Sequence, residues 1–154
     1  MSFDSSIAKL GLVLPPAPKP MGVYRPVVVS RGMVYVSGHG PLQPDGSVIT
    51  GRVGADLDLE AGYRAARVTG LAILASLRAE LGSLDKIGRL VKTLGMVHST
   101  PDFLDHPKVI NGYSELMVEV FGDDAGRGAR SAIGMVALPG NIAVEVEAIF
   151  ELAS

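Results

Sequence analysis

One arginine and two glutamates near the end of the sequence have the types and spacing to act on a small charged molecule. Arg130 opens the run "SAIGMVAL", and Glu145 and Glu147 alternate with valines in "AVEVEA". A guanidinium can bind a carboxylate through two parallel hydrogen bonds, and a glutamate beside a bound water can accept its proton. A Pro-Gly turn at 139–140 predicts a hairpin that brings the carboxylates back beside the arginine. A rim salt bridge and a solvated strand position are the commoner uses of such residues, so these three alone decide nothing.

Other reactive side chains give weaker patterns. Metal ligation would have to draw on five residues: His39, His98, His106, Asp102 and Asp105. No pair of them has helical or zinc-finger spacing, so we expect no metal site. Ser37 and Ser131 lack the strand-turn-helix context of a catalytic serine. The Gly-x-Gly of "SGHGPL" precedes a loop rather than a helix, so it does not fit a dinucleotide-binding fingerprint.

The bulk composition predicts one soluble, cytoplasmic domain. The chain has 154 residues, a formal net charge of −2 and no cysteine. This charge disfavours nucleic-acid binding through bulk electrostatics, and the lack of cysteine excludes disulfides and thiol catalysis. We find neither a secretory signal nor an apolar run of about 18 residues, and therefore expect no membrane span. Because 47% of the residues are hydrophobic, we expect either a large core or apolar surface covered by other subunits.

Turn signals divide the first part of the chain. Residues 1–20 are predicted to form a lead-in helix or coil and a Pro-rich arm, and residues 21–154 a single domain. Two β-rich runs within 27–38 flank Arg31-Gly32, which predicts a hairpin. Asp45-Gly46 marks the tip of a further turn.

Two helices are predicted from apolar residues that recur at three- and four-residue steps. The first is capped by Asp56 or Asp58 and stops at Gly82. Its stripe consists of Leu59, Tyr63, Ala66, Gly70, Ile73, Leu77 and Leu81. The second has Pro107 in its first turn and ends near Gly122, with "GDDAGRG" as a flexible loop after it. Its stripe consists of Val109, Ile110, Tyr113, Leu116, Met117 and Val120.

Three further strands, at 90–99, 130–138 and 142–151, complete the order ββ-α-β-α-ββ. On the last strand one face is apolar, with Ile142, Val144, Val146, Ala148 and Phe150. The other face carries Glu145, Glu147 and Glu151. This order predicts an α+β domain with helices on one face of the sheet, whose other face oligomerisation would cover.

These motifs together resemble the RidA/YjgF family. Tyr24, "VYVSGHGPL", "LGSLDKI", "VINGYSELMVEVFG" and "ARSAIGMVALPGNIAVEVEA" occur in the family's order, from about Tyr24 to Leu152. The 13 positions from Tyr24 to Ser37 and the 15 from Arg130 to Glu145 also match its pattern. The resemblance implies a chorismate-mutase-like fold, with a mixed sheet carrying two helices on one face. It also implies a homotrimer with clefts between neighbouring subunits.

The resemblance implies an activity as well. Family enzymes hydrolyse reactive 2-enamine and 2-imine acids, such as 2-aminoacrylate, to 2-keto acids and ammonia without a cofactor. By this resemblance Arg130 binds the substrate carboxylate, and Glu145 orients or deprotonates the attacking water. The other substrate-binding positions implied are Tyr24, Ser37, Gly38, Asn111 and Ala132.

The chain departs from the best-studied branch in ways that resemble a longer subgroup. Ala132 stands where cysteine is common, His39 where glutamine is frequent, and the segment between Asn111 and Arg130 is slightly longer. Two alternatives to the deaminase therefore stay open. One is a non-catalytic trimer that binds a small carboxylate, which would need the arginine but not the glutamate. The other is an endoribonuclease, which the negative net charge and the absence of a recognisable histidine pair disfavour.

Overall fold

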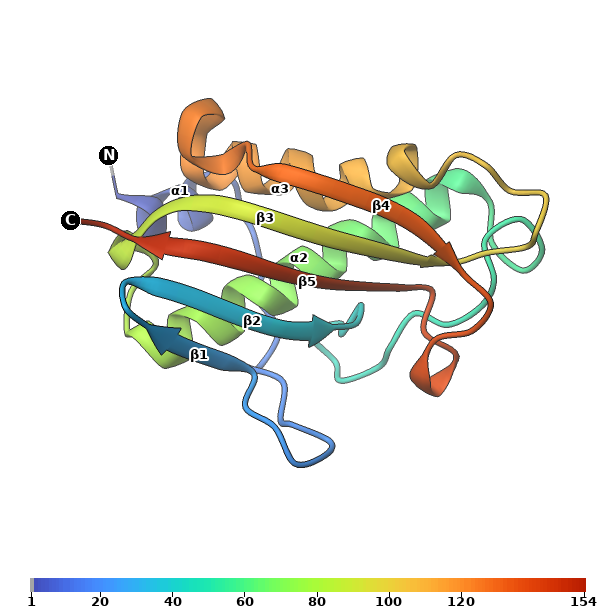
Figure 1. The fold of residues 1–154 in the computed structure, drawn as a ribbon, viewed down its shortest axis with the longest axis horizontal. Helices are drawn as coiled ribbons and strands as arrows, with labels where there is room; N and C mark the ends of the chain where they lie inside the picture. Colours follow the sequence, from blue (N-terminus) through green and yellow to red (C-terminus); the bar gives the residue numbers. More distant parts are fainter. Residues whose placement is uncertain (1) are drawn as a thin grey trace.

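The computed structural model describes residues 2–154 as one five-stranded sheet with helices packed behind it (Figure 1). In chain order the elements are α1 (Phe3–Lys9), β1 (Val27–Ser30), β2 (Met33–His39), α2 (Leu59–Leu81), β3 (Ile87–His98), α3 (His106–Gly126), β4 (Ala129–Met135) and β5 (Val144–Leu152). Two short 3-10 turns, Leu84–Lys86 and Pro139–Asn141, precede β3 and β5. The fold is α+β with a mixed sheet, as predicted.

The two C-terminal strands are not neighbours. The sheet order is β1-β2-β5-β3-β4, with β5 antiparallel to β2 and β3, and β4 parallel to β3 at the edge. The predicted hairpin between the Arg130 strand and the Glu145 strand is therefore wrong, because β3 separates them. The reason is burial, since the core-facing row of β5 fits beneath both long helices at the centre of the sheet. That row is fully or nearly fully buried: Val144, Val146, Ala148 and Phe150.

The first hairpin and the long helix follow their turn and cap signals. Between β1 and β2, Arg31 and Gly32 have φ angles of 51° and 79°, the left-handed pair that a two-residue hairpin turn requires. At the start of α2, the Asp58 carboxylate accepts a hydrogen bond from the Ala61 N–H at 2.8 Å. Gly82 ends the helix in the left-handed conformation at φ 84°. The second of the two predicted caps and the predicted stop are thus confirmed.

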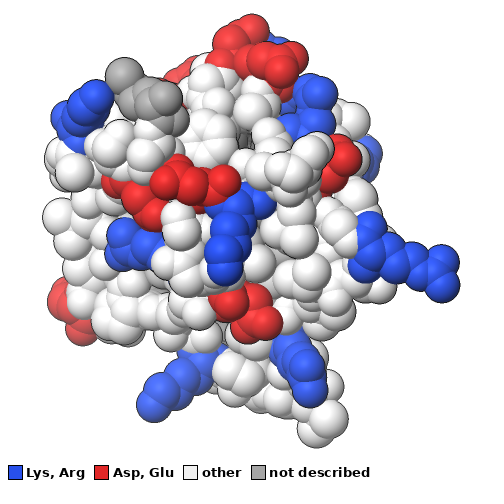
Figure 2. Space-filling view, turned by 90° about the vertical axis from the view of Figure 1, so that its left-hand side faces the viewer, with Lys and Arg blue, Asp and Glu red and all other residues white. Residues whose placement is uncertain are grey.

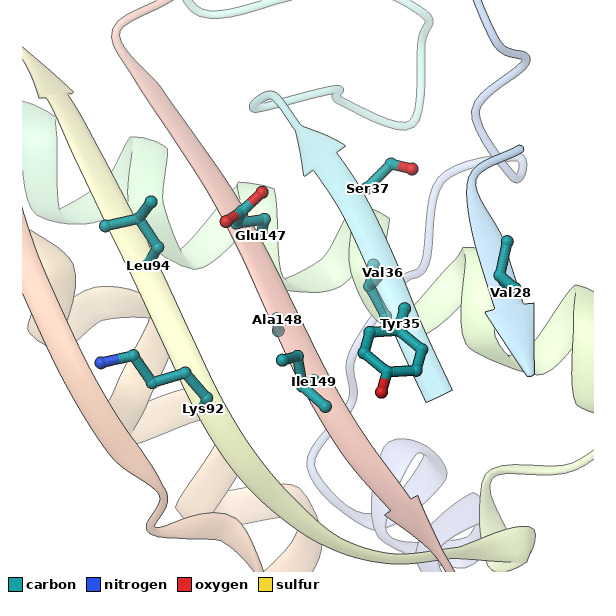
Figure 3. A pocket seen from close by; sticks show the side chains of 9 residues that line it. All are labelled: Val28, Tyr35, Val36, Ser37, Lys92, Leu94, Glu147, Ala148 and Ile149. Atoms are coloured by element: carbon teal, nitrogen blue, oxygen red, sulfur yellow. The ribbon is translucent and has the colours of Figure 1, made fainter. Parts of the chain in front are cut away.

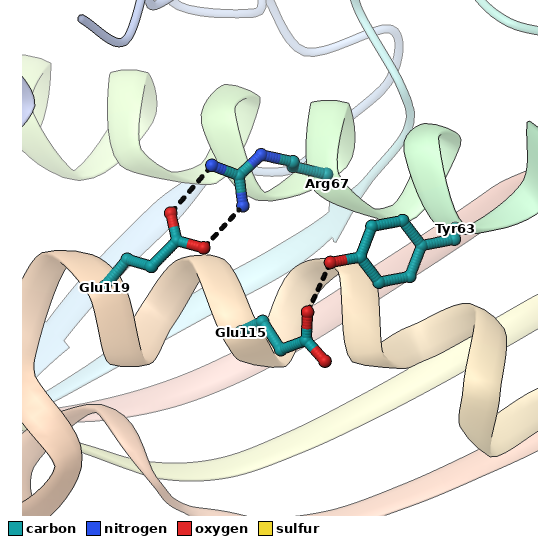
Figure 4. Close-up of polar contacts among 4 residues, drawn as sticks. All are labelled: Tyr63, Arg67, Glu115 and Glu119. Carbon is teal, nitrogen blue, oxygen red and sulfur yellow. Dashed lines mark hydrogen bonds and ion pairs between the residues drawn. The ribbon is translucent and has the colours of Figure 1, made fainter. Parts of the chain in front are cut away.

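The helices α2 and α3 pack at unusually close range. A Cβ at Gly112 would lie 2.0 Å from the carbonyl oxygen of Tyr63, so only glycine allows this approach. On the outer side of the contact, the Tyr63 hydroxyl donates to Glu115 (Figure 4). One turn further, the Arg67 guanidinium makes two hydrogen bonds with Glu119, at 2.7 and 3.1 Å. These polar bridges fix the register between the helices.

The end of α3 differs from the prediction. The helix does not give way to a loop at Gly122 but kinks there, at φ 84° and ψ 165°, and continues to Gly126. The continuation is close-packed, since a Cβ at Gly126 would lie 2.4 Å from the carbonyl oxygen of Met117. Most of the "GDDAGRG" segment is therefore a short helical turn, and only Arg127 and Gly128 link it to β4. After this turn the chain joins the sheet edge at Ala129, one residue before Arg130.

The N-terminal helix α1 packs on the same domain. Phe3 meets Phe121 edge-on, with ring centroids 5.0 Å apart, and Ile7 joins the main core. The Asp85 carboxylate accepts a hydrogen bond from the Ser2 hydroxyl at 2.7 Å. The C-terminus lies at the same end of the molecule as α1 (Figure 1).

The face of the sheet opposite the helices is only partly buried. A hollow of about 410 Å³ there is lined by side chains of four neighbouring strands, β1, β2, β5 and β3 (Figure 3). Val28 and Tyr35 are each 45% exposed, and Ile149 is half-buried. Lys92 and Glu147 are the charged groups of the hollow. We refer to this surface as the open face.

Candidate functional site

One group of the predicted site residues meets in a single cavity. The cavity has a volume of about 880 Å³ and is lined by the N-terminal arm, the end of β2, two loops and the start of β5. Tyr24, Ser37, Gly38 and Glu145 all contribute to its wall. This size is within the range of small-molecule sites, and its lining is mainly apolar with a few polar groups.

Glu145 is held directly against the backbone of β2. A Cβ at Gly38 would lie 2.6 Å from Oε2 of Glu145, so a side chain at that position would displace the carboxylate. Partial burial, and secondly the negative charge of Glu147, raise the pKa of Glu145 above its usual value. A glutamate whose pKa is raised in this way is a stronger base for a nearby water.

The arm is fastened to the cavity wall by Ser37. The Ser37 hydroxyl donates a hydrogen bond to the Arg25 carbonyl oxygen at 2.6 Å, and its N–H donates to the Pro26 carbonyl at 2.9 Å. Next to it, the Tyr24 hydroxyl accepts a hydrogen bond from the Met21 N–H at 3.3 Å. Tyr24 as a whole is 48% exposed. Tyr24 is thus positioned at the rim with part of its surface uncovered.

A second group of predicted residues gathers around Arg130 on β4. One terminal nitrogen of the guanidinium donates to Asn111 Oδ1 at 2.8 Å and to Ser114 Oγ at 3.1 Å, both on α3. Among residues 2–154, Arg130 forms no ion pair. Its Nε and its other terminal nitrogen make no side-chain hydrogen bond in the same part of the chain. Ala132, two residues further along β4, is half-buried against the core.

The two groups do not meet within one chain. Arg130 is paired with Thr93 and Glu145 with Met96, both on β3. Two strand spacings and a three-residue offset put their Cα atoms on the order of 14 Å apart. Their side chains also leave opposite faces of the sheet: Arg130 reaches α3, whereas Glu145 shares the open face with Glu147. A small acid bound by one copy of Arg130 therefore cannot reach Glu145 of the same copy.

The sequence matches the family described as "YjgF/chorismate mutase-like, putative endoribonuclease" over residues 4–152. The chain belongs to the RidA/YjgF family. It is 40% identical to protein TCP17 of Trypanosoma cruzi, covering 96% of this chain and 92% of that protein. It is also 40% identical to a structurally determined protein of unknown function from Agrobacterium tumefaciens, with a TM-score of 0.89 and coverage of 98% and 92%.

Two further solved structures carry functional names. A "putative endoribonuclease" from Shewanella oneidensis is 29% identical, with a TM-score of 0.94 over 99% of this chain and 100% of that one. RidA from an Antarctic Psychrobacter is 26% identical, with a TM-score of 0.61 and coverage of 88% and 93%. The fold of this RidA/YjgF member therefore superposes on relatives over nearly its whole length.

One contributor to the site was not predicted from the sequence, and the role of a second was predicted only in part. Ser114, the second anchor of Arg130, follows Asn111 by three positions, which places both on the same side of a helix and could have identified it. Glu147 was treated only as a companion of Glu145, although it lines the cavity and raises the pKa of that residue. Residues two apart on a strand lie on the same face, so the spacing of Glu145 and Glu147 already indicates that their charges are close together.

No other chemistry is apparent in the part of the chain that the structure describes. Within residues 2–154, no three His, Asp or Glu side chains are grouped so that they could hold a metal ion. The helices between residues 2 and 154 include none with the length and apolarity to cross a membrane.

Proposed function

We propose that this protein hydrolyses 2-imino acids, and the 2-enamine acids in equilibrium with them, to 2-keto acids and ammonia. The sites lie between neighbouring copies of a homotrimer, and each uses Arg130 from one copy and Glu145 from the next. The observation that carries the proposal is the unpaired edge of Arg130. Its guanidinium is held by two neutral oxygens and faces no carboxylate among residues 2–154.

The anchoring of Arg130 suits it to a carboxylate ligand. Both anchors, Asn111 and Ser114, bond to the same terminal nitrogen, so the edge formed by Nε and the other terminal nitrogen keeps its donors. That edge matches the two oxygens of a carboxylate. Because the side chain is already ordered, little rotamer entropy is lost when the ligand binds.

Glu145 suits the hydrolytic half of the reaction. A water held by its carboxylate attacks the imine carbon, forming the C–O bond while Glu145 accepts one water proton. Glu145 passes that proton to the imine nitrogen, which gives a neutral carbinolamine. The C–N bond of the carbinolamine then breaks as its hydroxyl proton moves through Glu145 to the nitrogen, so that the C=O bond forms and ammonia leaves. The products are the 2-keto acid and ammonia, and water is the only co-reactant. Holding water and imine in contact distance supplies much of the acceleration, and proton transfer about 100- to 10,000-fold more.

The separation of the two groups supports the proposed assembly. Arg130 and Glu145 leave opposite faces of one sheet, so a small substrate needs a second copy to complete its site. The open face supports this assembly, because it exposes Val28 and Tyr35 around a hollow on a surface without helices. In a closed ring, every copy contacts the next through the same two different surfaces. Each interface can then join the Arg130 edge of one copy to the Glu145 cavity of the next.

A coupled assay tests the proposal. A pyridoxal-phosphate-dependent serine/threonine dehydratase generates the enamine, and keto-acid appearance is followed with and without this protein. We expect wild type to accelerate the reaction, and Arg130→Ala to lose most of the acceleration through kcat/KM. Arg127→Ala is the matched control, since Arg127 is an exposed arginine whose one ion pair within residues 2–154 is with Asp123. No acceleration by a folded wild-type protein on this enamine or on leucine-derived imine would overturn the proposal.

The same assay, together with a pyruvate-binding measurement and an RNA-cleavage assay, separates the alternatives. A carboxylate-binding protein without activity would bind pyruvate in an Arg130-dependent manner and yet give no acceleration. An endoribonuclease would cleave RNA, with binding that falls steeply as salt rises. The net charge of −2 gives no support to that activity, and Figure 2 shows basic and acidic side chains interleaved on one face of the molecule.

A further inference from the structure

The strand β2 contains a bulge at the residues that line the cavity. Val36 pairs with Ala148 and His39 with Val146 on β5, so three steps along β2 match two steps along β5. Side chains normally alternate between the faces, yet Val36 and His39 are both buried, at 4% and 5% exposure. An odd spacing between two buried residues requires one extra residue, which is a β-bulge. The extra residue falls within Ser37-Gly38.

The imidazole of His39 ties this bulge to the helix layer. Nδ1 lies 2.6 Å from the Ser37 carbonyl oxygen, and Nε2 lies 2.8 Å from Ser76 Oγ on α2. A carbonyl oxygen can only accept, so Nδ1 carries the proton and Nε2 accepts from the Ser76 hydroxyl. Burial lowers the pKa of His39, which favours this neutral form. Both ring nitrogens are therefore satisfied in a single orientation.

The bulge is also the surface on which Glu145 rests. A Cβ at Gly38 would meet the Glu145 carboxylate at 2.6 Å, so the carboxylate is in direct contact with bulge backbone. A shift of that backbone would therefore move or release the carboxylate. The pairing of β2 with β5 skips Ser37 and Gly38. On the β1 side the bulge is held by the bonds from Ser37 to Arg25 and Pro26, and on the helix side by the hydrogen bond from His39 to the Ser37 carbonyl.

We propose that His39 is a positioning residue, which fixes the Ser37-Gly38 bulge by linking it to Ser76 and so holds Glu145 in its catalytic place. The effect of His39 on catalysis rests on the function proposed above, whereas the structural link from His39 to the bulge does not. His39 lines the cavity, yet both of its nitrogens are occupied by protein groups, so it acts through the bulge and not on the substrate.

Ser76→Ala tests the link with little loss of volume, and Thr69→Val is its matched control. Thr69 is also buried on α2, and its hydroxyl donates to the Ala65 carbonyl at 2.8 Å, with no connection to the bulge. In Ser76→Ala we expect amide hydrogen exchange at Gly38 and His39 to accelerate about tenfold, as loss of one buried hydrogen bond allows. In Thr69→Val those two amides should exchange at the wild-type rate.

Turnover supplies the second readout. Ser76→Ala should lower kcat about tenfold with KM within about twofold, because Arg130 still binds the carboxylate. His39→Gln, whose amide can both donate and accept, should retain more activity than His39→Leu, which fills the space without hydrogen bonds. If Ser76→Ala matches Thr69→Val in both exchange and kcat, the proposal is overturned. If wild type has no activity, the function proposed above fails, and the exchange rates at Gly38 and His39 still decide for or against the link.

Discussion

Gly38→Ala perturbs the proposed catalytic geometry at one defined atom. The added Cβ would lie 2.6 Å from Oε2, 2.9 Å from Cδ and 3.3 Å from Cγ of Glu145. Ordinary contact begins near 3.4 Å, so the carboxylate has to retreat by about 0.8 Å or adopt another rotamer. A displacement of about 1 Å in a catalytic group can lower the rate by about 100-fold. We therefore expect kcat of Gly38→Ala to fall about 30- to 100-fold, with KM little changed.

Steady-state kinetics on the enamine and a thermal unfolding scan measure this prediction together. The unfolding temperature should change little, because the displaced group is the end of a partly exposed side chain. Shortening that side chain should relieve the clash, so Glu145→Asp should reduce kcat by a smaller factor in the Gly38→Ala background than in wild type. This non-additivity is the sign of direct contact. A Gly38→Ala protein with kcat within twofold of wild type would refute the assignment of Glu145 as the base.

Three further predictions concern the groups around the site and the core. Glu147→Gln removes a negative charge that raises the pKa of Glu145. Because the proposed base acts when ionised, the acidic limb of the kcat–pH profile should move to lower pH. An unmoved limb would count against the electrostatic coupling of Glu147 to Glu145. Asn111→Ala and Ser114→Ala each remove one anchor of Arg130 and should raise KM about three- to tenfold with smaller changes in kcat; unchanged KM in both would mean that the anchors do not orient the guanidinium. Within residues 2–154 the buried Tyr113 hydroxyl makes no hydrogen bond of good geometry, although Thr93 is a polar neighbour of it. Urea unfolding of Tyr113→Phe should therefore show equal stability or a gain of up to about 1 kcal/mol, and a loss above about 2 kcal/mol would show that Thr93 is a true hydrogen-bond partner.

The local elements were predictable because their signals are short-range. Asp58 and Gly82 carry the cap chemistry of α2, and Arg31-Gly32 carries that of the first hairpin. The alternation along β5 gave the correct division of faces, with Glu145 opposite the buried valines. Each of these features depends on the backbone preferences of a few neighbouring residues.

The strand order was not predictable from such signals. A Pro-Gly turn between two β-rich runs is typical of a hairpin, but here the 3-10 turn Pro139–Asn141 sends the chain past β3 to pair with β2 and β3. The choice of partner depends on how the whole apolar row of β5 is buried, which is a property of the assembled sheet. The kink at Gly122 was missed for a similar reason, since the helical turn after it is retained by close packing on Met117.

The site was only partly predictable for the same reason. Spacing and resemblance predict Arg130 and Glu145 as site residues, but the sequence alone placed them side by side in one hairpin. The anchor Ser114 and the buried contact between His39 and Ser76 depend on elements far apart in the chain. Distances of this kind arise only once α2 and α3 are packed on the sheet.

The most direct test of the central claim is complementation between two inactive variants. Arg130→Ala and Glu145→Gln subunits are each assayed alone and then after mixed reassembly, with hetero-oligomer formation verified by native mass spectrometry. If each site takes Arg130 from one copy and Glu145 from the next, random mixing at equal amounts restores about one quarter of the wild-type sites. Activity rising to that level is the predicted result. Activity that stays at the level of the separate variants, in samples shown to contain mixed oligomers, would contradict the account.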